Sequence, residues 1–427
     1  MDRYYAKKLL GFYENELVNN ILFFWDEKCI DRVNGGYFNC FDNRGENLIS
    51  RDKYNWSQGR FVWMWSKLAT MDCGTFTLAQ RAKFLEYAKL GRDFLAKHCL
   101  LGENDWRCAF LLDETGKKKT LDGYGDRLDL SLSADKFVAA GFAGYAVAAG
   151  DEDSFLFAKN LYLSIRERYA SGDFMSLPYQ LPPKYRSHPM GMIHLTSELH
   201  MAGLKFDPAF AEESKVWLKE YLDDMLDNFT DENFVMREVI FSADNSQLPS
   251  LLGQHMNPGH ILEAMWFMLD AADILEEAPG YLGKIAAVSK KTLECGWDTE
   301  YGGLLHFCGV NGGEPIAPLE PDTDEPMQQL VLRTWDDKLW WPHSETLYTA
   351  LLLFDRTKDS SFLEWHDKLF DYTFDHHPNP NREVREWIQI LTRDGKPQEK
   401  VVALPVKDPF HITRNLIQII ELLYKLC

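Results

Sequence analysis

The segment FVAAGFAGYAVAA at residues 137–149 carries no charged side chain, and ILEAMWFMLDAA at 261–272 is apolar on nearly every side. A helix that is apolar all round is buried. The segment 208–228 differs, because Phe210 and Trp217 share one helical face and charged residues occupy the opposite face. Buried and amphipathic helices alternate in this way through most of the chain, which predicts pairs of one inner and one outer helix.

Apolar residues that recur with the helical period of 3.6 predict twelve helices. They span residues 3–25, 57–71, 76–98, 132–149, 152–169, 190–203, 208–228, 259–274, 278–296, 342–355, 359–375 and 411–425. The buried helices begin at intervals of about 70 residues, a loose internal repeat. Six helix pairs fit a closed ring, so we expect an all-α fold, the (α/α)6 barrel or six-hairpin toroid.

Strand signals are confined to the connections between helices. They predict short β-hairpins near residues 35–45, 234–241, 301–307 and 385–395. No Pro/Ser-rich linker or charge block divides the chain, so we expect a single domain over residues 1–427.

Composition excludes several functional classes. The 427 residues carry a net charge of −19, which disfavours binding to nucleic acid or to an anionic membrane. The sequence shows neither a membrane-spanning apolar run nor a signal-peptide pattern, and its eight scattered cysteines are typical of reduced thiols, so we expect a cytoplasmic protein. It also lacks zinc-ribbon, P-loop and GxGxxG motifs, so we expect no metal.

Each predicted buried helix carries polar residues near its start. These are Gln58 and Arg60, Ser133 and Asp135, His194, His260 and Glu263, His343 and Glu345, and His411 and Arg414. In a barrel the inner helices point the same way, so these groups would converge at one mouth. The helix N-termini would keep the histidines neutral and would stabilise an oxyanion. Such a mouth suits proton abstraction next to a carbonyl, through an enediolate.

Alternative interpretations of these residues stay open at this point. Glu263 lies one helical turn after His260 and could fix its tautomer, or the two could form a buried pair that only satisfies itself. His194 could equally cap or pack a helix. Trp340 and Trp341 could form a core cluster or a wall for the apolar face of a sugar. A metal set of His194, His260, His343 and Glu263 is a further alternative, although no HExxH spacing supports it.

Five motifs in order resemble the N-acylglucosamine 2-epimerase superfamily, which also contains cellobiose 2-epimerases, mannose isomerases and sulfoquinovose isomerases. They are GGYFNCFDNRG (35–45), WSQGR (56–60), NPGHILEAMWF (257–267), LWWPHSE (339–345) and PFHITR (409–414). The family fold is an (α/α)6 barrel, in agreement with the helix count. WSQGR departs by one residue from the commoner WLQGR of the family.

The resemblance implies that His260 and His411 flank C2 of an open-chain sugar, one removing the C2 proton and the other returning it. Glu263 would orient His260. The implied substrate-binding residues are Trp56, Arg60, His194, Arg237, Glu238, Trp340, Trp341, His343 and Phe410. We therefore expect a cofactor-independent sugar 2-epimerase that interconverts N-acetylglucosamine and N-acetylmannosamine.

Other functions are kept as alternatives. An aldose–ketose isomerase would deliver the proton to C1. A glycoside hydrolase would use paired carboxylates among Glu238, Glu263 and Glu345. A non-catalytic sugar-binding protein would bind without proton exchange. Epimerases of the family respond to nucleotides such as ATP, but the sequence has no phosphate-binding loop that would support such activation here. Family members are often homodimers, and the composition does not decide the oligomeric state of this protein.

Overall fold

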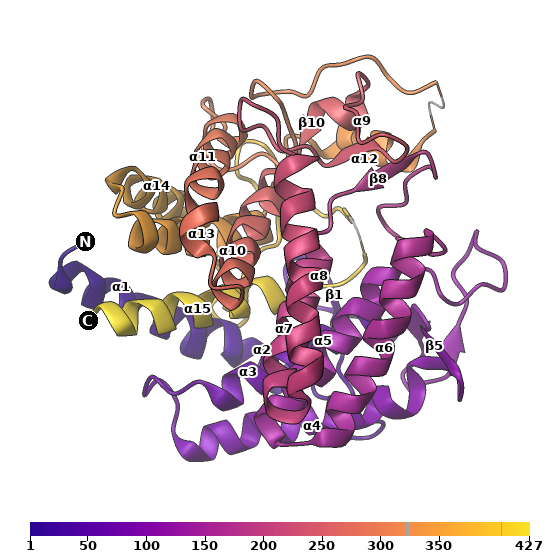
Figure 1. Cartoon of the computed structure of the whole chain (residues 1–427). Helices are drawn as coiled ribbons and strands as arrows, with labels where there is room; N and C mark the ends of the chain where they lie inside the picture. Colours follow the sequence, from indigo (N-terminus) through magenta and orange to yellow (C-terminus); the bar gives the residue numbers. More distant parts are fainter. Residues whose placement is uncertain (322–323, 403) are drawn as a thin grey trace. The chain divides into compact units, whose positions relative to one another are not determined.

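The computed structural model describes residues 1–321, 324–402 and 404–427, which are mostly helical (Figure 1). The chain divides into two compact units. The first unit comprises Met1–Tyr5, Tyr179–His194 and Trp217–Leu404, and the second comprises Ala6–Pro178, Leu195–Val216 and Pro405–Cys427. Each unit is described by itself below, and the single-domain organisation expected for residues 1–427 stays a prediction.

The helices follow the predicted segments closely. They are α1 (Arg3–Asn15), the π-helical η1 (Glu16–Ile21), α2 (Leu22–Lys28), α3 (Asn55–Thr70), α4 (Leu78–His98), α5 (Leu132–Ala149), α6 (Glu152–Ser171), α7 (Met190–Phe206), α8 (Pro208–Asp227), α9 (Leu251–Gln254), α10 (Pro258–Ile274), α11 (Ala278–Gly296), α12 (Pro326–Thr334), α13 (Trp340–Thr357), α14 (Ser360–His376) and α15 (Phe410–Leu426). The predicted helix 3–25 is three consecutive helical segments, and the short helices α9 and α12 were not predicted.

In the second unit, α3 packs against α4 and α5, and α5 packs against α6. Small residues permit this contact, because a Cβ atom on Gly59 would lie 2.4 Å from the backbone of Phe137. A Cβ atom on Gly141 would similarly lie 2.5 Å from the carbonyl oxygen of Gly59. The Ala- and Gly-rich segment is therefore largely buried over residues 138–146, where two helix backbones touch, and its end at Val147 is exposed.

In the first unit, α10 packs against α11 and α13, and α13 packs against α14. Most side chains of α10 and α13 are buried, as their apolar sequences predict. Gly259, at the start of α10, allows close contact with α13, because a Cβ atom there would lie 2.6 Å from the indole of Trp341.

The strands are short and antiparallel, and several pair over long sequence separations. The pairs are β1 (Cys40–Phe41) with β2 (Leu48–Ser50), β4 (Leu100–Gly102) with β5 (Asp105–Cys108), β8 (Tyr185–Ser187) with β9 (Val239–Phe241), β10 (His255–Met256) with β11 (Cys308–Gly309) and β12 (Lys338–Leu339) with β13 (Ile390–Leu391), and β6 (Leu111–Leu112) pairs with both β3 (Lys53–Tyr54) and β7 (Lys118–Lys119).

The short pairings predicted near 234–241, 301–307 and 385–395 are present as local antiparallel bridges: Thr230 with Met236, Ile240 with Gln247, Trp297 with Leu304, Pro378 with Trp387 and Leu391 with Pro397. The sequence did not predict that β9, β11 and β13 also pair with distant strands that precede buried helices, β9 with β8, β11 with β10 and β13 with β12. Hydrophobic alternation marks a strand but does not name its partner. The long-range pairs matter for function because they fix the backbone just before α7, α10 and α13.

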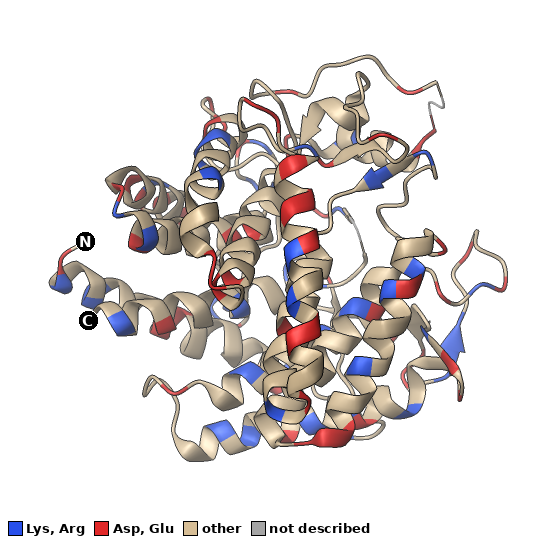
Figure 2. Ribbon diagram, viewed as in Figure 1, with Lys and Arg blue, Asp and Glu red and all other residues tan. Residues whose placement is uncertain are grey.

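Charged residues of both signs lie along α8, as Figure 2 shows, so the acidic residues of this helix do not form one continuous patch. No described helix is long and apolar enough to cross a membrane. The cysteines are all free thiols, and all but Cys427 are buried.

Candidate active site

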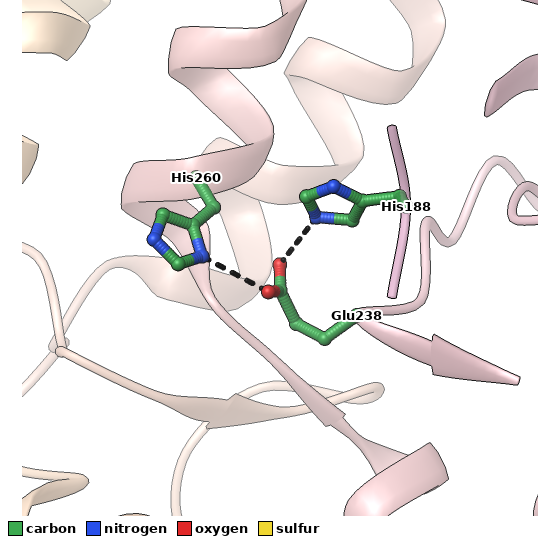
Figure 3. A group of neighbouring side chains, drawn as sticks. All are labelled: His188, Glu238 and His260. Carbon is green, nitrogen blue, oxygen red and sulfur yellow. Dashed lines mark hydrogen bonds and ion pairs between the residues drawn. The ribbon is translucent and has the colours of Figure 1, made fainter. Parts of the chain in front are cut away.

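The first unit brings His188, Glu238 and His260 together, and these three residues are called the trio below (Figure 3). Strands β8 and β9 explain the first pair. Ser187 lies opposite Val239 in their antiparallel register, so the next residues outward, His188 and Glu238, are neighbours. His260 comes from the first turn of α10. Two loop residues and one helix residue thus converge through sheet register.

The two carboxylate oxygens of Glu238 are shared between the two rings. Nε2–H of His188 donates to Oε1 over 3.1 Å, and Nδ1–H of His260 donates to Oε2 over 3.0 Å. Burial alone would raise the pKa of Glu238, but the charges and hydrogen bonds of the two histidines hold it well below its usual range. An ionised carboxylate can only accept hydrogen bonds, so Nδ1 of His260 carries the proton and Nε2 has the lone pair.

The cap of α10 brings a second polar group near Nδ1 of His260. The Oδ1 atom of Asn257 accepts the backbone N–H of His260 over 3.1 Å, which turns the side-chain amide toward Nδ1 at 3.1 Å. Nδ1 thus faces an amide donor and a charged acceptor, and the carboxylate is the stronger partner. The ring also packs against Trp341, with centroids 5.2 Å apart. His260 is the accessible member of the trio, since 22% of its side chain is exposed and the other two are buried.

This geometry changes the role predicted for Glu263. Glu263 is buried on α10, but the carboxylate that binds Nδ1 of His260 belongs to Glu238. Carboxylate oxygens of Glu263 and Glu345 approach within 4.8 Å of each other, and Glu345 accepts a hydrogen bond from Nε1 of Trp266 over 2.9 Å. Helical spacing identified a neighbour on the same helix, whereas the sheet supplies the ring's partner.

His343 has both ring nitrogens occupied within the first unit, and Arg237 has an ion-pair partner there while its contact with a sugar stays a prediction. Nδ1–H of His343 donates to the carbonyl of Leu339 over 2.6 Å, and its Nε2 accepts the N–H of Leu304 over 3.0 Å. No ring nitrogen of His343 remains for a substrate, which differs from our expectation and also removes it from the alternative metal set. The guanidinium of Arg237 forms an ion pair with Asp231 over 3.2 Å, inside the first unit.

The remaining predicted residues of the first unit lie on buried helices. The ring of His194 stacks on Phe267, with centroids 4.5 Å apart. Trp341 is buried in an apolar cluster with Leu339 and Ile390, and Trp340 packs against the cluster while it is partly exposed. Both tryptophans therefore pack in this cluster, and Trp341 in addition touches His260, while their contact with a sugar stays a prediction.

The second unit holds Arg60 in a cage of aromatic rings. Its Nη1 forms a buried ion pair with Oδ2 of Asp408 over 2.6 Å. The rings of Trp56, Phe137 and Phe410 lie 5.2, 4.0 and 4.9 Å from the guanidinium carbon. Cation–π contacts and the ion pair together fix the orientation of this cation.

His411 lies in the first turn of α15 in the same unit and is buried. Nη2 of Arg414, one helical turn later, lies 3.4 Å from its Nδ1. The neighbouring motif WSQGR also holds the loop that contains GGYF, because Gln58 exchanges two hydrogen bonds of 2.8 Å with the backbone of Tyr37. The WSQGR and GGYF segments, which are separate in the sequence, are thus joined by these hydrogen bonds.

Sequence reasoning missed His188 and Asp408. His188 lies two residues before α7, in a His-Pro step, and Asp408 lies two residues before α15. Their positions just before a buried helix were the sequence signal that could have identified both residues. The donor atoms of the trio lie within 4.8 Å of one another, so a His2Glu set could also accept a divalent cation. The hydrogen bonds to Glu238 already account for this arrangement without one.

Comparison with known proteins identifies the family. The family model described as N-acylglucosamine 2-epimerase (GlcNAc 2-epimerase) matches residues 36–414. The chain belongs to the N-acylglucosamine 2-epimerase family. It is 28% identical to the N-acylglucosamine 2-epimerase of Mus musculus over 94% of this chain and 89% of that protein.

Solved structures show the same fold. The cellobiose 2-epimerase of Bacillus thermoamylovorans matches with a TM-score of 0.75 at 16% identity, over 97% of this chain and 99% of that one. A D-mannose isomerase matches with a TM-score of 0.73 at 17% identity, over 97% and 98%. These likenesses confirm the predicted (α/α)6-barrel fold class, and the family makes the protein a carbohydrate epimerase, an enzyme of the isomerase class.

Proposed function

We propose that this family member is a sugar 2-epimerase that interconverts N-acetylglucosamine and N-acetylmannosamine without a cofactor. The hydrogen bond from Nδ1 of His260 to Glu238 is the observation that carries the proposal. It orients a partly exposed imidazole with its lone pair on Nε2, which is the form that a general base requires. The similarity to the N-acylglucosamine 2-epimerase of Mus musculus supports the choice of substrate.

In the proposed reaction, His260 and His411 act on opposite faces of C2 in the open-chain sugar. One histidine takes the C2 proton, the electron pair of the C–H bond forms a C1–C2 double bond, and the carbonyl electrons move to O1, which gives an enolate (an enediolate where C2 carries a hydroxyl group, as in mannose). The other histidine returns a proton to the opposite face of C2. Arg60 would hold substrate oxygens and offset the negative charge of the enolate, because its cation is already oriented by Asp408.

The substrate and product decide the proposal. The protein is incubated in D2O with N-acetylglucosamine, mannose, glucose and cellobiose in separate reactions, and the products are read by NMR. We expect N-acetylmannosamine with deuterium at C2. Epimerisation of cellobiose alone would replace the proposed substrate, and no exchange at C2 of any of the four sugars would contradict the proposal.

An aldose–ketose isomerase is the second candidate, because a D-mannose isomerase shares the fold with a TM-score of 0.73. It would give fructose from mannose or glucose in the same experiment. A glycoside hydrolase would instead depend on carboxylates, so Glu263→Gln and Glu345→Gln would abolish activity while His260→Asn and His411→Asn retained it. A cytoplasmic location and a homodimer stay predictions, as does activity without ATP.

A further inference from the structure

The two histidines of the proposed mechanism have neighbours of opposite charge at the same ring atom. In the first unit, Nδ1 of His260 faces the carboxylate of Glu238 at 3.0 Å. In the second unit, Nδ1 of His411 faces the guanidinium of Arg414 at 3.4 Å, a long hydrogen bond. A carboxylate accepts hydrogen bonds and a guanidinium only donates them. The same nitrogen is therefore a donor in one ring and an acceptor in the other.

We infer that His260 and His411 rest in opposite tautomers, which makes His260 the proton acceptor and His411 the proton donor of the substrate-free enzyme. In neutral His260 the proton is on Nδ1 and the lone pair on Nε2. In neutral His411 the lone pair on Nδ1 accepts from Arg414, so Nε2 carries the proton. Glu238 and Arg414 act through the two rings and are positioning residues. The inference rests on the proposed function for its catalytic meaning, but the tautomers themselves do not depend on substrate.

The charges that develop during the reaction fit these neighbours. When Nε2 of His260 takes the C2 proton, the ring becomes an imidazolium beside the carboxylate of Glu238. When neutral His411 gives its Nε2 proton to C2, that ring becomes an imidazolate beside the guanidinium of Arg414. The proton taken by His260 and the proton lost from His411 balance, and exchange with water resets both rings. Each ring thus changes charge in the direction that its neighbour stabilises.

His188 extends the arrangement behind Glu238. Its Nε2–H donates to Oε1, so its Nδ1 carries a lone pair, and that atom is buried without a hydrogen-bond partner in the described chain. His188 therefore occupies one carboxylate oxygen of Glu238 and leaves the other to His260.

Nitrogen-15 NMR of histidine-labelled, deuterated full-length protein tests the tautomers directly. Spectra are recorded without substrate at about pH 8, where ordinary imidazoles are neutral. Spectra of His260→Asn and His411→Asn assign the two rings by loss of their signals. We expect a protonated Nδ1 in His260 and a protonated Nε2 in His411. The same tautomer in both rings would overturn the inference, even if the enzyme epimerises the proposed sugar.

Substitution of the neighbours provides the second arm. Glu238→Gln should move the proton of His260 to Nε2. Arg414→Met should lower kcat at least about tenfold with little change in KM. Arg414→Lys keeps a hydrogen-bond donor, so it should restore part of the lost kcat. Glu325→Gln and Arg92→Met are matched controls, because Glu325 is buried at the cap of α12 and Arg92 pairs with Asp151 at the surface. Unchanged tautomers in folded Glu238→Gln and Arg414→Met would refute the positioning roles, and the wild-type spectrum decides the case if either variant fails to fold.

Discussion

Nδ1–H of His260 donates its hydrogen bond to Oε2 of Glu238 over 3.0 Å. An ionised, buried acceptor at this atom selects the tautomer in which Nε2 can take a proton, as in other histidine bases that are held by a carboxylate. The orientation of the base thus depends on a residue from a loop, 22 positions before it in the sequence.

Replacement of Glu238 by Gln should lower kcat about 10³-fold, because the amide can donate to Nδ1 and so favours the wrong tautomer. KM should change much less, since the substitution leaves the shape of the site intact. Steady-state kinetics and circular dichroism of the variant check this, with Glu325→Gln as the control. Wild-type turnover in a folded Glu238→Gln protein would mean that this hydrogen bond has no catalytic role.

Replacement of Asp408 by Asn should both weaken substrate binding and destabilise the fold. It leaves the cation of Arg60 buried among aromatic rings with a neutral partner, and breaking a buried ion pair costs about 3–5 kcal/mol. Chemical denaturation should show a loss of about 3 kcal/mol, and KM should rise about tenfold. Lys67→Met is a suitable control, because Lys67 forms an exposed pair with Glu421 in the same unit. Unchanged stability and KM would show that Asp408 does not hold Arg60.

Replacement of Gly259 by Ala should push the indole of Trp341 away from its contact with α10. The new methyl group would lie 2.6 Å from the indole, and overpacking of this kind costs about 1–3 kcal/mol. Since Trp341 packs against His260, kcat should also fall about tenfold or more. Gly280→Ala in α11 is the matched control, because its methyl group would meet no atom within 4 Å. Equal stability and equal turnover of the two variants would contradict the packing role of Gly259.

Buried histidines should make the fold sensitive to acid. Burial lowers the pKa of His306 to about 3, and the nearby His260, Lys400 and His255 act in the same direction. The unfolded chain binds a proton at this residue below about pH 6.5 and the folded chain does not, so the stability that it contributes is complete above pH 6.5 and is lost as the pH falls toward 3. His306→Gln should therefore flatten the pH dependence of the unfolding free energy in this window by up to about 1.4 kcal/mol per pH unit. An equal slope of unfolding free energy against pH in the wild type and in His306→Gln would contradict this role of His306.

The sequence predicted the helices well because their apolar periodicity is local. Helix α5 spans Leu132–Ala149 and α11 spans Ala278–Gly296, as predicted, and the family motifs located His260 and His411. The strand partners were not predictable in the same way, because register between β8 and β9 depends on chain segments about 50 residues apart. That register places Glu238 and His188 beside each other. The spacing of residues along a helix carries no information about strand register, so it pointed to Glu263 as the partner of His260.

The exchange of the C2 proton in His411→Asn tests the central claim, that two histidines act on opposite faces of one carbon atom. The variant is incubated in D2O with N-acetylglucosamine and with N-acetylmannosamine separately, and C2 deuteration and epimerisation are followed by NMR. We predict epimerisation at least about 10²-fold slower than in the wild type, with deuterium still entering C2 of the one epimer whose C2–H faces His260. Epimerisation at the wild-type rate, or loss of exchange from both epimers in a folded protein, would contradict the account.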